Sequence, residues 1–268
     1  MRESEHPDAL DCILRGRAAR LQPNSRKVLA EAISLFERAL ALDPRSVEAQ
    51  SLLANALANR VMDQMTDSAT ADIARAEGLV GQALVASPRR ALVHYAKGNV
   101  LRAQYRCEEA IPEFETVLAI NRNAANALHA LGWCKLMTGS IEEVIPLEEQ
   151  VIRLSPRDPG IAYWYARIGI VHLLQSQTDE AIVWLEKARS ANPEVQFFHA
   201  FLASPYGLKG ETERAAAELA EARRLTGEGS YASIARMQAT GHSGVPKIRA
   251  LFEATYFVGL RKAGVPEE

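Results

Sequence analysis

The chain has 268 residues, of which 48% are hydrophobic and 24% are charged, and this composition excludes a disordered or collagen-like protein. Its 31 Lys and Arg residues nearly balance 33 Asp and Glu residues, giving a net charge of −2. No general excess of positive charge is available to neutralise phosphates, so nucleic acid is not the expected partner.

The N-terminal residues are polar and acidic, unlike a secretory signal, and an arginine and a histidine interrupt the most apolar stretch, residues 161–174. We therefore expect neither an export signal nor a membrane span. Cys12, Cys107 and Cys134 are far apart and form no C-x-x-C pair, which argues against a disulfide framework or a cysteine zinc site. These features predict a protein of the reducing cytoplasm.

One pattern occurs six times along the chain: a small residue, a larger one four positions later and a second small residue three positions after that. Ala110-x3-Phe114-x2-Val117 is an example. The six pattern starts are Ala32, Ala76, Ala110, Val144, Ala181 and Ala215. Three of the five spacings between them are 34 residues, and a proline soon after four of the patterns ends a helix. This period predicts stacked helical hairpins.

A small residue after a large one, as in Leu131-Gly132, precedes several of these pattern starts by twelve residues. The combined pattern resembles the tetratricopeptide repeat, in which small residues let two antiparallel helices approach closely. The resemblance implies an all-α fold, a right-handed α-solenoid of about six helix hairpins with a C-terminal helical cap. No alternating strand pattern competes with it, and we expect thirteen or fourteen helices and no sheet.

The expected solenoid covers residues 1–226, and the capping helices and tail cover 227–268. Its hairpins are expected near 9–44, 47–88, 91–122, 125–156, 161–193 and 196–227. Residues 61–72 contain the extra length of the second hairpin and predict longer arms joined by a polar turn. Ser140 and Glu143 predict a capping box at a helix start.

After a break at residues 227–230, residues 231–239 suggest another first helix. Pro246 then predicts a helix start, with the helix continuing to Lys262 and Gly264 ending it. This last pair resembles a cap that shields the apolar face of the array. The tail, residues 265–268, is expected to be mobile.

Familiar catalytic and nucleotide-binding motifs are absent, so we predict no catalytic residue, no cofactor and no metal. His94, His129, His172 and His199 fall on expected first helices but form no i, i+4 ligand pair, which favours packing over metal binding. Cys107 opens a second helix, where a reactive thiol is conceivable, although a buried structural thiol is favoured.

In tetratricopeptide proteins, positions 2, 5, 9, 12 and 13 of each first helix face a concave groove, and we call this side the first-helix face. The resemblance implies partner-binding residues there: Tyr95, Asn99, Arg102, His129, Trp133, Tyr163 and Phe197. Aromatic side chains beside Asn and Arg suit a protein or peptide segment. The alternative is that some of these aromatic side chains pack between neighbouring first helices.

The same register directs Met137, Ile170, Leu174 and Ser204 toward the groove. Tetratricopeptide domains that bind a C-terminal carboxylate use Lys at position 5, where this chain has other residues such as Ser51 and Tyr95. We therefore do not predict binding of chaperone tails.

Longer stretches are similar to the C-terminal tetratricopeptide region of bacterial class III adenylate/guanylate cyclase-like signalling proteins. The stretches are residues 36–44, 131–139, 154–159, 170–174, 184–189 and 259–264. No catalytic residue of a cyclase can be placed on this chain. The leading hypothesis is a non-catalytic scaffold or adaptor that binds a protein segment in its groove. The alternative is a regulatory module that acts on a nucleotide cyclase domain in cis or in trans.

Overall fold

The computed structural model describes residues 6–22, 25–226, 229, 231–239 and 244–268. Every regular element within these residues is helical. Because η1 continues into α8, and α14, η2 and α15 follow one another without a break, the described residues form fourteen continuous helical segments and no strand. The predicted all-α fold is confirmed. No described helix combines the length and the apolar character needed to cross a membrane.

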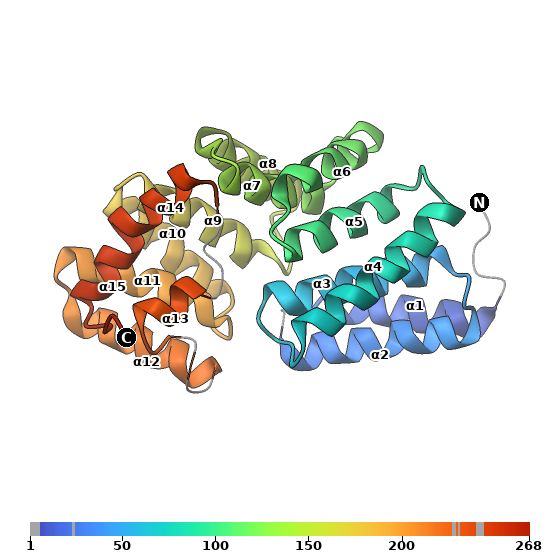
Figure 1. The fold of residues 1–268 in the computed structure, drawn as a ribbon, viewed down its shortest axis with the longest axis horizontal. Helices are drawn as coiled ribbons and strands as arrows, with labels where there is room; N and C mark the ends of the chain where they lie inside the picture. The colour runs from blue at the N-terminus through green and yellow to red at the C-terminus, as the bar shows by residue number, and fades with distance from the viewer. Residues whose placement is uncertain (1–5, 23–24, 227–228, 230, 240–243) are drawn as a thin grey trace. The chain divides into compact units, whose positions relative to one another are not determined.

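Antiparallel helix hairpins follow one another along the chain (Figure 1). The first three are α1 (Pro7–Ala19) with α2 (Arg26–Leu42), α3 (Val47–Met62) with α4 (Ala69–Ala86), and α5 (Ala91–Ala103) with α6 (Cys107–Ile120). The next three are α7 (Ala125–Met137) with η1 (Ile141–Glu143) and α8 (Val144–Leu154), α9 (Ile161–Leu174) with α10 (Thr178–Ala191), and α11 (Gln196–Lys209) with α12 (Thr212–Thr226). The chain ends with α13 (Ile234–Ala239), α14 (Pro246–Phe252), the π-helical turn η2 (Glu253–Phe257) and α15 (Val258–Lys262).

The chain divides into two compact units, Met1–Cys134 and Lys135–Glu268, which we call unit 1 and unit 2. The division falls inside α7. In both units the first helix of a hairpin packs against its second helix and against the first helix of a neighbouring hairpin, as in the α3–α4 and α3–α5 contacts. This packing places the side chains of successive first helices beside one another.

The six small residues that start each pattern are completely buried: Ala32, Ala76, Ala110, Val144, Ala181 and Ala215 each have 0% exposure. The glycines on the first helices show why the residues at a helix crossing must be small. A Cβ atom added to Gly98 would lie 2.6 Å from the ring of Phe114, and one added to Gly169 would lie 2.7 Å from Leu185. The predicted register of the repeat is therefore confirmed at these helix crossings.

The second hairpin has the longer arms and the polar turn that its extra residues predict. An ion pair joins the two arms near the turn, with Arg60 Nε donating to Asp72 Oδ2 at 2.8 Å. Thr66 in the turn donates its hydroxyl to the same carboxylate at 2.6 Å. Ser68 caps α4 by accepting a hydrogen bond from Ala71 N. These bonds hold the polar turn against the two arms of the hairpin.

Two local predictions are wrong. Ser140 makes no side-chain capping bond, because the chain enters α8 through the 3₁₀ turn η1. The tail is held in place: Val265 is buried, and the carbonyls of Pro266 and Glu267 accept hydrogen bonds from Ile234 N and Ala235 N. Pro246 begins a helix as predicted. Most of the expected break at 227–230 lies outside the described residues.

Candidate functional site

The first-helix face of unit 1 contains five of the seven predicted partner-binding residues. Tyr95 and Arg102 on α5 and His129 and Trp133 on α7 are each half-buried, so part of every one of these side chains is accessible. Tyr95 also packs against the ring of Phe114, with ring centroids 6.1 Å apart. The face therefore presents aromatic, imidazole and guanidinium groups, and each of these side chains is partly packed against the protein.

Asn99 differs from these residues because its exposure is 0%. Its Nδ2 donates to Asn55 Oδ1 on α3 at 2.7 Å, and its Oδ1 accepts from Arg102 Nη1 at 2.8 Å. Since both ends of the amide are bonded inside the protein, Asn99 positions its two neighbours and has no surface of its own to offer a partner. The sequence predicts that Asn99 contacts a partner, but its bonds make it a residue that positions Arg102 and Asn55.

The other two predicted residues, Tyr163 on α9 and Phe197 on α11, belong to unit 2 and are half-buried. Their ring centroids are 5.8 Å apart, and Phe197 also contacts Phe198 at 4.6 Å and Phe201 at 6.4 Å. Tyr163 and Phe197 thus form one end of an aromatic cluster between two first helices. This is the packing role that the sequence left open as an alternative.

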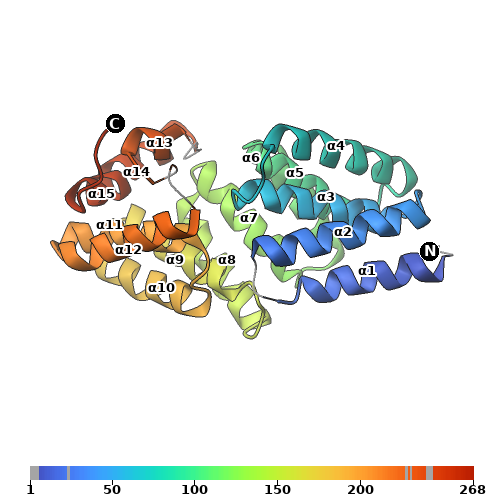
Figure 2. The same ribbon diagram turned by 90° about the horizontal axis from the view of Figure 1, so that it is seen from below.

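The aromatic cluster continues into the last helices of the chain. Phe201 on α11 stacks on Tyr256 in η2, with centroids 4.5 Å apart, and Tyr256 in turn contacts Phe252 on α14. Ser204 donates its hydroxyl to the carbonyl of Tyr256 at 2.9 Å. Both η2 and α15 pack against α11, and η2 also contacts α9. Figure 2 shows α15 beside α11. We call residues 244–268 the C-terminal segment.

The C-terminal segment covers the first-helix face of unit 2. At its start, Val245 N donates to the carbonyl of Met137 at the end of α7. Farther along, the backbones of α11 and α15 approach so closely that a Cβ on Gly207 would lie 2.1 Å from the carbonyl oxygen of Gly259. The register positions Met137, Ile170, Leu174 and Ser204 are consequently all buried. They were expected to face a groove, and the chain's own C-terminal segment occupies that place.

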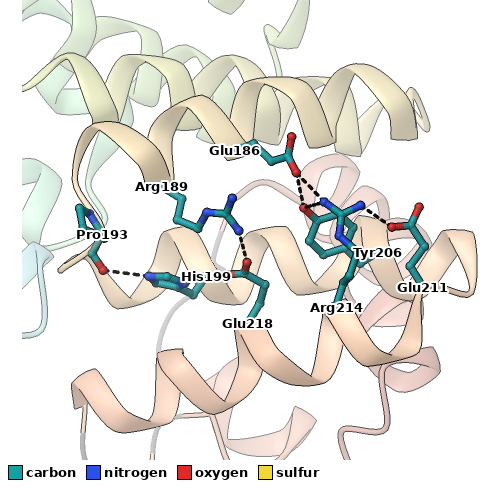
Figure 3. A network of polar contacts seen from close by, with 8 residues as sticks. All are labelled: Glu186, Arg189, Pro193, His199, Tyr206, Glu211, Arg214 and Glu218. Carbon is teal, nitrogen blue, oxygen red and sulfur yellow. Dashed lines mark hydrogen bonds and ion pairs between the residues drawn. The ribbon is translucent and has the colours of Figure 1, made fainter.

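A polar network joins α10, α11 and α12 on the other side of α11 (Figure 3). His199 Nδ1 lies 2.6 Å from Glu218 Oε2, and its Nε2 lies 2.8 Å from the carbonyl oxygen of Pro193. Arg189 forms an ion pair with the same Glu218. Burial alone would lower the pKa of His199, but hydrogen bonds to Glu218 and Pro193 outweigh it and raise the pKa.

A second cluster on the same three helices surrounds Tyr206, whose hydroxyl lies 2.5 Å from Glu186 Oε1 and 2.5 Å from Arg214 Nη2. Arg214 also lies over the Tyr206 ring and forms an ion pair with Glu211. Burial, followed by the hydrogen bond to Glu186, raises the pKa of the Tyr206 hydroxyl. Each of the two clusters bonds side chains from α10, α11 and α12 to one another, so both hold the hairpins together.

Cys12, Cys107 and Cys134 are buried and form no disulfide bond with one another. No group of three or more His, Cys, Asp or Glu residues with metal-binding geometry occurs among the residues that the structure describes. No repeat or motif in the sequence indicates that the C-terminal segment packs on first helices. Two glycines, Gly207 and Gly259, mark that crossing, but glycine alone does not identify its partner helix.

Comparison with known proteins agrees with the fold. Residues 95–159 match the family model for the tetratricopeptide repeat. A chain in the crystal structure of the APC/C hetero-tetramer Cut9–Hcn1 is similar with a TM-score of 0.66 and 16% identity, over 89% of this chain and 44% of that one. Human IFIT1, solved as a dimer with m7Gppp-AAAA, gives a TM-score of 0.64 and 15% identity over 95% of this chain and 57% of that one.

PilW, described as a widely conserved type IV pilus biogenesis factor, has a TM-score of 0.57 and 15% identity over 86% of this chain and 97% of its own. A search of curated protein sequences finds no match. The chain thus spans less than half the length of the Cut9–Hcn1 chain and just over half of IFIT1. At these identities the likeness concerns the fold, which is an all-α solenoid of the tetratricopeptide type.

Proposed function

We propose that this chain is a non-catalytic scaffold that binds an extended segment of another protein on the first-helix face of unit 1. The repeat fold supports the general role, because tetratricopeptide proteins bind protein or peptide partners. The observation that carries the location is the contrast between the two units. In unit 2 the C-terminal segment packs on this face, where Ile170, Leu174 and Ser204 are buried and Tyr163 and Phe197 are half-buried. On the same face of unit 1, Tyr95, His129 and Trp133 keep part of their surface accessible, and α3 and α5 pack mainly on each other and on α2, α4 and α6 of the same unit.

Within this proposal the seven predicted residues have different roles. Tyr95 and Trp133 supply aromatic contact area, and Arg102 and His129 supply hydrogen-bond donors. Asn99 fixes Arg102 and Asn55 from beneath. Tyr163 and Phe197 belong to the cluster that holds the C-terminal segment, so their contact with a partner is limited to their exposed edges.

Selection of peptides from a random display library against the full chain would test this proposal. A parallel selection against the Trp133→Ala variant distinguishes binding on the first-helix face from binding elsewhere. We expect peptides that bind the wild-type chain and lose affinity for Trp133→Ala. Peptides that bind both proteins equally would place the interaction on another surface and refute the proposed location.

A second candidate is the regulation of a class III nucleotide cyclase domain in the cytoplasm. The stretches of sequence similarity given above are its support, with 131–139 and 259–264 among them. Mixing the purified chain with a bacterial class III cyclase domain would test it. A change in the rate of cyclic nucleotide formation that depends on chain concentration would favour this role, and an unchanged rate together with no co-elution would refute it for that cyclase.

A further inference from the structure

Charge is divided between the two helices of each hairpin in the later repeats. The first helices α5, α7, α9 and α11 contain no Asp or Glu at all. Their second helices α6, α8, α10 and α12 contain two to four each. The charged side chains of these four first helices are therefore only cations.

Nearly all of these cations are already neutralised from within the chain. The five Lys and Arg residues on these first helices are Lys97, Arg102, Lys135, Arg167 and Lys209. Four of them lie within 4 Å of a carboxylate: Lys97 of Glu113 at 2.6 Å, Lys135 of Glu143 at 3.2 Å, Arg167 of Glu148 at 3.9 Å and Lys209 of Asp179 at 2.7 Å. Arg102 is the exception among the described residues.

Arg102 is half-buried, and its one hydrogen bond is made by Nη1 to a neutral acceptor, Asn99 Oδ1. Its Nε is buried and bonded to nothing in the described part of the chain. Because Nε is buried, a partner can reach only the outer NH₂ groups of the guanidinium. Of these, Nη1 is bonded to Asn99, so Nη2 is the donor that remains for a carboxylate.

The hydrogen bonds around Arg102 have a direction that specifies the ligand. Arg102 donates to Asn99, and Asn99 donates to Asn55 Oδ1 on the neighbouring first helix. The groups left over at the two ends are donors, namely Nη2 of Arg102 and Nδ2 of Asn55. Donors on two adjacent first helices call for a ligand that accepts hydrogen bonds and has negative charge.

We propose that Arg102, positioned by Asn99 and assisted by Asn55, binds the side-chain carboxylate of an Asp or Glu in the partner segment. This inference rests on the proposed function, because it assigns the chemistry of a segment bound on the first-helix face of unit 1. A single unneutralised guanidinium matches the single charge of a carboxylate. A phosphate or nucleic acid would require several cations, and the nearby Lys97 is paired with Glu113.

Fluorescence anisotropy with labelled peptide pools would test the assignment on the full chain. Three twelve-residue pools share the same randomised apolar positions and differ at the remaining positions, which hold Glu, Gln or phosphoserine. Each pool is titrated into the wild-type chain, Arg102→Gln and Arg75→Gln. Arg75 is the matched control, since it lies on the second helix α4 and pairs with Glu37, and its replacement removes the same charge from a different face.

We expect the wild-type chain and Arg75→Gln to bind the Glu pool at least tenfold more tightly than the Gln pool, and Arg102→Gln to lose that difference. Equal binding of the Glu and Gln pools by the wild-type chain would overturn the carboxylate site. An unchanged preference in Arg102→Gln would overturn it as well. A phosphoserine pool that binds more tightly than the Glu pool and depends on Arg102 would reassign the site to phosphate.

The failure of the underlying function has a different signature. If neither Trp133→Ala nor Arg102→Gln changes the affinity of any pool, the first-helix face is not where the pools bind, and the proposed function fails at that location. A preference for Glu that requires Arg102 but not Trp133 would keep the carboxylate site while refuting the aromatic contact. Thermal melts of each variant exclude unfolding as the cause.

Discussion

His199 and Glu218 form the same contact in the sixth hairpin that His94 and Glu113 form in the third. In each case the histidine Nδ1 lies 2.6 Å from a carboxylate oxygen on the second helix. Nε2 of each ring faces the carbonyl of the proline that follows the preceding hairpin, at 2.9 Å from Pro88 and 2.8 Å from Pro193. The repeat thus uses histidine to join three consecutive segments of chain.

Stability should depend on pH through the His199–Glu218 pair. In the folded chain the pKa of His199 is raised above 6.5. The protonated ring therefore adds its full contribution to the free energy of unfolding below pH 6.5, and this contribution is lost as the pH rises through the raised pKa. Burial would raise the pKa of Glu218, but the bonds from His199 and Arg189 lower it below 4.5. Its contribution is complete above pH 4.5 and is lost as the pH falls through the lowered value. The pair therefore stabilises most between pH 4.5 and 6.5.

Measuring Tm from pH 5 to pH 8 in wild type and His199→Gln checks this window. The wild-type Tm should exceed that of the variant most near pH 5.5, and the gap should narrow toward pH 8. His172→Gln is the control, because His172 bonds the neutral amide oxygen of Gln177. A gap that stays constant with pH would show that His199 does not contribute through its charge.

The helix crossings should not tolerate larger residues. Ala110→Leu and Ala181→Leu each place a bulky side chain where exposure is 0%, and we expect a loss of about 1–3 kcal/mol in the free energy of unfolding. Urea denaturation followed by circular dichroism measures it. A neutral effect at both positions would contradict the packing described here.

Two glycines should respond in opposite directions to the same substitution. Gly98→Ala puts a methyl group 2.6 Å from Phe114, whereas a Cβ on Gly78 in α4 meets no atom within 4 Å. We expect Gly98→Ala to lower Tm and Gly78→Ala to raise it. The Gly78→Ala substitution should raise the free energy of unfolding by about 0.4–1 kcal/mol, because alanine restricts the unfolded chain. Thermal melts of the two variants measure both shifts in Tm. Shifts of the same sign would contradict the close crossing at Gly98 or the open space at Gly78.

Trp133 should act at the binding face with a limited effect on folding. Because the side chain is half-buried, Trp133→Ala should weaken the binding of a selected peptide by roughly 2 kcal/mol while the helical circular dichroism signal is kept. Calorimetric titration beside a thermal melt separates the two effects. Unchanged affinity in a folded variant would remove Trp133 from the site.

The C-terminal segment should be released by a single methyl group. In Gly207→Ala the new Cβ would lie 2.1 Å from the backbone oxygen of Gly259, and the rigid helices cannot both stay in place. We expect faster amide hydrogen exchange and proteolysis in residues 244–268. Gly81→Ala, which meets nothing within 4 Å, is the control. Equal protection in both variants would mean that the crossing adapts without undocking.

The sequence by itself determined the helical repeat. Ala110, Phe114 and the residues at equivalent positions predict the fold because a close helix crossing admits only small residues beside large ones, a local requirement that leaves a period in the chain. The same register placed Tyr95, Arg102 and Trp133 on the first-helix face. The aromatic packing of Tyr163 remained an open alternative, since spacing gives a residue's direction but not its neighbours.

Tertiary structure decided which parts of that face remain accessible. Ser204 and Leu174 follow the groove register, yet Tyr256 and the rest of the C-terminal segment pack on this face, and contacts between segments distant in sequence have no period. Asn99 likewise has the expected position, but its burial depends on Asn55 from another hairpin. Which cation lacks a carboxylate is also a question of distance between helices, so only the folded chain distinguishes Arg102 from Lys97.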